Sequence, residues 1–170
     1  IQKCKKIWNK NNKNLTYSKI NKAAEKAEAY LFRINPDHHD FLNPNNMVKA
    51  VKNYCKSTEQ YVPKSIGEIA RGIYESLAFK YAEEIDKLEK ITDKKIEYVN
   101  IVGGGSSAEL ICQYTANLSQ KVVISGPIEA AAAGNILAQL MRAGEIKNLK
   151  EGRKLIIDSF ELKKYHPNFQ

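Results

Sequence analysis

The chain has few of the residues that build disulfide scaffolds or metal centres. Its three cysteines, Cys4, Cys55 and Cys112, are an odd number without CxxC spacing, which argues against a disulfide framework and against a zinc site. Its three histidines show no metal-ligand spacing either, and we expect His38-His39 to lie in a polar turn rather than in a metal site. The sequence therefore predicts reduced thiols, a cytoplasmic location and no metal ligands.

Long apolar runs are also missing. No stretch approaches the length of a membrane span and no signal peptide opens the chain, so we expect no contact with a membrane. The first residue is Ile1 rather than methionine, from which we expect a fragment, a processed product or an excised domain.

Arginine is scarce although the chain is basic. The formal net charge is +8, from 27 lysines and arginines against 19 aspartates and glutamates, and only four of the 27 are arginine. Surfaces that read bases or clamp phosphates favour arginine. The lysines are spread along the chain, which favours a solvated lysine surface over a nucleic-acid partner. A nucleic-acid-binding helical domain stays open as an alternative based on charge alone.

The 170 residues are enough for one domain with a real core, and they divide into two regions. Residues 1–62 are polar and read as helices around a turn-rich loop at 35–44. Residues 63–170 read as an α/β core. A capping box at Ser65 to Glu68 opens a long helix that we expect to reach about Leu88.

The second region alternates helices and short apolar strands. We expect strands at 96–102 and 121–124, separated by a helix over about 107–118, with Ser106 and Glu109 at capping-box spacing. Helices over about 129–142, ended by Gly144, and about 149–159 follow. This order predicts an α/β layer with parallel pairing.

Two glycine-bearing turns follow these two strands. The first is Gly103-Gly104-Gly105-Ser106, and the second is Ser125-Gly126-Pro127. Glycines after a strand allow a ligand to approach the backbone, although a tight structural turn explains them as well. Because carboxyl ends of parallel strands meet at one edge, where open α/β sheets bind ligands, the pair of turns favours a binding crevice.

Residues 101–145 resemble the carboxyl-terminal part of the FGGY carbohydrate kinases, and in particular their rhamnulokinase branch. The motifs that carry the resemblance are Ile101 to Ser106, Gln113 to Asn117, and Gly126 to Ala130 with Gly134 to Leu137. Further matches in the expected order, from Asn35-Pro36-Asp37 to Pro167-Asn168, extend it over almost the whole chain.

The resemblance implies part of an actin-like ATPase (ribonuclease H-like) domain, with a small sheet flanked by helices. It implies transfer of the γ-phosphoryl group of ATP to the 1-hydroxyl of L-rhamnulose, with Mg²⁺. The family's aspartate base, phosphate loop and sugar contacts lie upstream of everything present, so no catalytic residue is assigned and we expect the fragment alone to be inactive. The nucleotide positions that carry over are Gln2 and Gly104, flanked by Gly103, Gly105 and Ser106.

One departure from the family and one structural consequence follow. The family commonly has asparagine where this chain has Ala108, so a non-catalytic nucleotide-binding or assembly module remains an alternative. The two predicted strands would leave an open sheet edge, which predicts a homo-oligomer or a complementing amino-terminal fragment.

Overall fold

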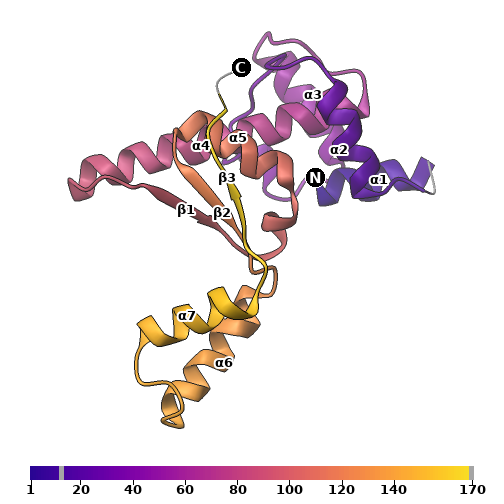
Figure 1. Cartoon of the computed structure of the whole chain (residues 1–170). Coiled ribbons are helices and arrows are strands. Elements are labelled where there is room, and N and C mark those ends of the chain that lie inside the picture. The colour runs from indigo at the N-terminus through magenta and orange to yellow at the C-terminus, as the bar shows by residue number, and fades with distance from the viewer. Residues whose placement is uncertain (12–13, 169–170) are drawn as a thin grey trace. The chain divides into compact units, whose positions relative to one another are not determined.

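The computed structural model describes residues 1–11 and 14–168, and within them it has seven α-helices and three β-strands (Figure 1). This confirms the predicted α/β class with a small sheet. The chain divides into two compact units, Ile1–Tyr81 and Ala82–Gln170, and helix α4 (Ile66–Thr92) begins in the first and ends in the second. Among the described residues, no helix is both long and apolar enough to cross a membrane.

The first unit is helical. Besides the start of α4 it contains α1 (Gln2–Asn11), α2 (Tyr17–Lys26), α3 (Met47–Ser57) and the short 3-10 helix η1 (His39–Phe41). The predicted capping box before α4 is confirmed: the Glu68 N–H donates to Ser65 Oγ at 3.1 Å, and the Ser65 N–H donates to Glu68 Oε2 at 3.3 Å.

A buried carboxylate ties the segment after α2 to α4. Glu75 is 3% exposed; its Oε1 accepts from Arg71 Nε at 2.7 Å and its Oε2 accepts from the Tyr30 N–H at 2.9 Å. Arg71 also donates to the Ala27 carbonyl at 2.9 Å. A buried charge is tolerated only when it is paired and hydrogen-bonded, so this network fixes the path of the chain between Ala27 and Tyr30.

The sheet of the second unit has the order β1-β2-β3. Strands β1 (Tyr98–Ile101) and β2 (Val122–Ser125) pair in parallel, as predicted, through the crossover helix α5 (Glu109–Ser119). Strand β3 (Lys163–Tyr165) pairs antiparallel to β2 and was not predicted, because two lysines and a tyrosine show no apolar alternation.

The two faces of this sheet differ in burial. Val123 and Ser125 are buried on the face that α5 covers, whereas Tyr98 and Asn100, which pair with Val122 and Ile124, are exposed on the opposite face. Helices α6 (Ala130–Arg142) and α7 (Leu149–Ser159) pack against each other. Gly144, with φ of +82°, follows the end of α6 as the sequence predicts.

All three cysteines are free, buried thiols. Cys4 and Cys55 lie in the first unit and Cys112 lies in α5 of the second. Burial raises the pKa of Cys55 and of Cys112 to about 11, because the thiolate would lose its hydration. The three side chains therefore act as small apolar core groups at neutral pH.

Gly67→Ala tests the close contact between α2 and α4. A Cβ at Gly67 would collide with the backbone carbonyl of Ala23, so we expect a loss of about 1–3 kcal/mol in the free energy of unfolding. Gly134→Ala in α6 is the matched control, since nothing lies within 4 Å of its Cβ position; helix propensity predicts a gain of about 0.5–1 kcal/mol. Urea denaturation measures both, and equal effects would contradict the contact.

Glu89→Gln tests an ion pair within the second unit, between the last part of α4 and Lys121 beside β2. Glu89 Oε1 lies 2.7 Å from Lys121 Nζ and accepts from the Ile96 N–H at the same distance. The hydrogen bond from Lys121 is the main cause that lowers the pKa of Glu89 from 4.5 to about 2. A carboxyl group whose pKa is lowered by folding stabilises the fold at any pH above its pKa in the unfolded chain. That contribution disappears as the pH falls from 4.5 towards 2.

We therefore expect the urea midpoint of the wild type to exceed that of Glu89→Gln at pH 6 to 7, with the gap closing in acid. Glu97→Gln, at an exposed glutamate of the same unit, is the control and is expected to leave the midpoint nearly unchanged. A gap between wild type and Glu89→Gln that stays constant down to pH 3 would refute the assignment.

Candidate functional site

The two glycine-bearing turns meet at the carboxyl ends of β1 and β2. The Gly103 N–H donates to the Pro127 carbonyl at 3.0 Å, and the Gly126 N–H donates to the Ile101 carbonyl at 2.9 Å. Because β1 and β2 are parallel neighbours, both turns leave the sheet at the same edge (Figure 1). The expected pairing of the turns is confirmed.

The glycines of the first turn have different tasks. Residues Gly103–Ser107 form a 3-10 helix, η2, which begins with Gly103 at φ +74°, a conformation that favours glycine. Gly104 has no such constraint, yet nothing lies within 4 Å of where its Cβ would be, and a Cβ at Gly105 would make only ordinary contact with Ile101 at 3.9 Å. Gly103 is needed for the backbone conformation of the turn, whereas Gly104 leaves open space beside the backbone.

Ser106 is used inside the turn. It is 6% exposed and its Oγ donates to the Gly103 carbonyl at 2.7 Å. The predicted capping role of Ser106 is wrong: the N-cap of α5 is Ala108, which has no side-chain hydrogen bond to offer. Ser106 therefore stabilises the glycine turn, and the α5 N-terminus keeps its backbone N–H groups without a side-chain cap.

A cavity of about 400 Å³ lies beside the turns. Ser106 and Ser107 line it from the first turn, residues 126–129 from the second, and Lys163 and Tyr165 from β3. Lys163 Nζ lies 2.7 Å from Glu109 Oε1, and this hydrogen bond raises the pKa of Lys163. Sequence reasoning missed the β3 residues, because the short charged strand carries no pattern that places it at this edge.

Of the predicted nucleotide positions, Gly103, Gly104, Gly105 and Ser106 lie together in η2 of the second unit. Gln2 is the first residue of α1 in the first unit, where its side chain is exposed. Among the described residues, no cluster of histidine, cysteine, aspartate or glutamate ligands lies at the glycine turns.

Comparison with known proteins identifies the family. Residues 1–143 match the model of the FGGY family of carbohydrate kinases, C-terminal domain. The chain is 42% identical over 152 residues to the rhamnulokinase of Bacillus subtilis (strain 168), covering 89% of this chain and 31% of that protein. It is 37% identical over 167 residues to the rhamnulokinase of Bacteroides thetaiotaomicron, covering 98% of this chain and 34% of that protein.

A third relative, the rhamnulokinase of Ligilactobacillus salivarius (strain UCC118), is 41% identical over 92% of this chain and 32% of its own length. The chain thus spans about a third of the length of the curated relatives it matches. With the family match extending from residue 1 to residue 143, the chain belongs to the FGGY family of carbohydrate kinases and corresponds to the family's C-terminal domain.

Proposed function

We propose that this chain is the carboxyl-terminal, nucleotide-binding part of a cytoplasmic rhamnulokinase. The complete enzyme would transfer the γ-phosphoryl group of ATP to the 1-hydroxyl of L-rhamnulose. The observation that carries the proposal is the glycine turn, open at Gly104, at the shared edge of two parallel strands. Its setting in a chain about 40% identical to rhamnulokinases supports the choice of sugar.

The open backbone at Gly104 suits the adenosine part of ATP. A flat base or a ribose can approach a main chain that carries no side chain, with Gly103, Gly105 and Ser106 shaping the turn beneath it. Gln2, which lies in the first unit, is proposed as a nucleotide contact on the family resemblance alone.

The charges of the adjoining cavity favour ribose over phosphate. Glu109, Glu129 and Glu161 line it, and its cation, Lys163, is already paired with Glu109. Excess negative charge repels phosphates, whereas carboxylates accept hydrogen bonds from ribose hydroxyls. The described residues here offer no ligand cluster for Mg²⁺, so we assign that ion to no residue of this chain.

A second candidate is a non-catalytic nucleotide-binding or assembly module of the same fold. Ala108 favours it, because the N-cap of α5 lacks the side-chain amide that the family commonly has there. Measuring whether the chain binds nucleotide separates an ATP-binding kinase part from an assembly module.

Titration of the chain with ATP and ADP in a calorimeter tests the nucleotide site. We expect saturable binding, and Gly104→Leu is expected to weaken it at least about tenfold, or roughly 1.4 kcal/mol. The leucine would occupy the open space through which the ligand approaches, and it meets no atom of the chain within 4 Å at its Cβ. Its fold is therefore expected to be intact, which circular dichroism checks.

Asp86→Leu, at an exposed position of α4 in the same unit, is the matched control and should leave nucleotide affinity unchanged. Equal affinity of Gly104→Leu and wild type would remove Gly104 from the site. Failure of the wild type to bind either nucleotide would favour the assembly module.

We also propose that the outer edge of β1 pairs with another polypeptide, either a second copy or an amino-terminal fragment that completes the enzyme. In the part of the chain that the structure describes, β1 pairs with β2 alone. Parallel strands are normally covered on both faces, yet Tyr98 on β1 is 54% exposed. An exposed edge of this kind is a template for pairing with another strand.

Light scattering coupled to size exclusion tests self-association of the isolated chain. We expect a mass above that of one 19.2 kDa chain, and a shift towards the monomer for Tyr98→Lys, because a lysine on the edge strand discourages pairing. Leu42→Lys, at a 78% exposed position of the first unit, should not shift it. A monodisperse wild-type monomer would exclude the homo-oligomer and leave the complementing fragment.

A further inference from the structure

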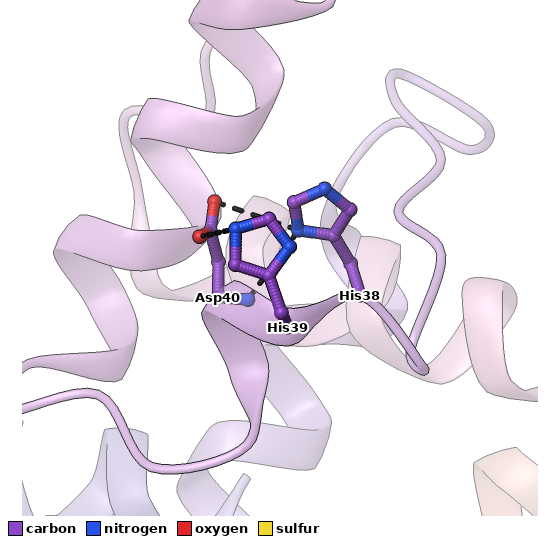
Figure 2. A group of neighbouring side chains, drawn as sticks. All are labelled: His38, His39 and Asp40. Carbon is purple, nitrogen blue, oxygen red and sulfur yellow. Dashed lines mark hydrogen bonds and ion pairs between the residues drawn. The ribbon is translucent and has the colours of Figure 1, made fainter.

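Three potential metal ligands gather at one turn of the first unit (Figure 2). His39 Nε2 lies 3.0 Å from Asp40 Oδ1, and His38 Nδ1 lies 3.5 Å from Asp40 Oδ2. The three ligand atoms are within 4.8 Å of one another. Among the described residues, this is the one group of three or more histidine, cysteine, aspartate or glutamate side chains with ligand atoms this close together. The spacing of the histidines in the sequence did not predict this convergence.

Local structure holds His38 in place. It is the N-cap of η1, and its Nδ1 accepts from the Asp40 N–H at 3.4 Å. Its ring packs edge-on against Tyr54, with centroids 5.1 Å apart, and against Phe41 at 6.1 Å. A nitrogen that accepts from an N–H carries a lone pair, which is the form of imidazole that coordinates a metal, and an ion bound at Nδ1 would replace the long hydrogen bond from the Asp40 N–H.

The three ligand atoms lie near enough to one another to share an ion after small side-chain rotations. Zn–N and Zn–O bonds of about 2.0–2.2 Å at tetrahedral angles place ligand atoms roughly 3.3 Å apart. The distance from His39 Nε2 to Asp40 Oδ1, 3.0 Å, is close to that value, whereas the 3.5 Å distance from His38 Nδ1 runs to the other carboxylate oxygen, Oδ2, so the Asp40 carboxylate would turn to offer one oxygen to an ion shared with both imidazoles. The His39 side chain is 80% exposed. Its ring therefore has room to rotate until His39 Nε2 and His38 Nδ1 are separated by the tetrahedral ligand–ligand distance as well.

Asp37 and the two thiols of this unit are already engaged or buried. Asp37 Oδ2 lies 2.8 Å from Lys80 Nζ. The thiols of Cys4 and Cys55 are buried with raised pKa values, because burial disfavours the thiolate that binds metals. A divalent ion at this turn would therefore be held by His38, His39 and Asp40, with water completing its shell.

We propose that this turn binds one divalent transition-metal ion of the Zn²⁺ class. Two imidazoles and one carboxylate form a mixed nitrogen–oxygen set that suits Zn²⁺, Co²⁺ or Ni²⁺ over Mg²⁺ or Ca²⁺. A bound ion would cross-link the turn between α2 and α3. The site lies within the first unit and requires no residue of the glycine turns, so it is independent of the proposed kinase function.

Zn²⁺ titration by calorimetry, on the full 170-residue chain without an affinity tag, tests the proposal, with Co²⁺ absorption as the report of tetrahedral geometry. We expect one ion per chain. His39→Gln and Asp40→Asn should each lower affinity about 10- to 100-fold, the loss that even outer partners of metal ligands produce. Both side chains are exposed, so folding is expected to persist, which circular dichroism checks.

His166→Gln removes the third histidine of the chain, which lies in the second unit, and should bind Zn²⁺ like the wild type. Absence of Zn²⁺ binding by the wild type would overturn the proposal. So would unchanged affinity in both His39→Gln and Asp40→Asn, or a loss in His166→Gln equal to theirs.

Discussion

Parallel pairing of β1 with β2 is the constraint on which the second unit depends. It requires a crossover, which α5 provides, and it sends both chain exits to one edge. There the two backbone hydrogen bonds between Gly103 and Pro127 and between Gly126 and Ile101 join the turns into one surface. β3 then adds Lys163 and Tyr165 to the same edge by pairing antiparallel.

Much of this arrangement is readable from residue patterns. The capping box at Ser65 and the short apolar strands each carry a local physical signal that survives in the fold. The prediction failed where the signal is tertiary. Ser106 was expected to cap α5 because its spacing to Glu109 fits, but a closer carbonyl, that of Gly103, takes its hydroxyl.

The sequence also did not predict the ion pairs between residues that lie far apart along the chain. Glu89 meets Lys121 across 32 positions, and Lys163 meets Glu109 across 54. Neither contact has a periodicity that a sequence could reveal, because each depends on where the sheet places strand ends. The same holds for Glu75, whose burial makes sense only once Arg71 and the Tyr30 N–H are seen around it.

The placement of the cysteines gives each unit a native thiol whose labelling rate reports how often that unit opens. Thiol reagents attack thiolates that they can reach, and all three side chains are buried with raised pKa values. Modification of Cys112 therefore records opening of the second unit, while modification of Cys4 or Cys55 records opening of the first. Mass spectrometry of partly labelled chains can time the two events separately, without an introduced probe.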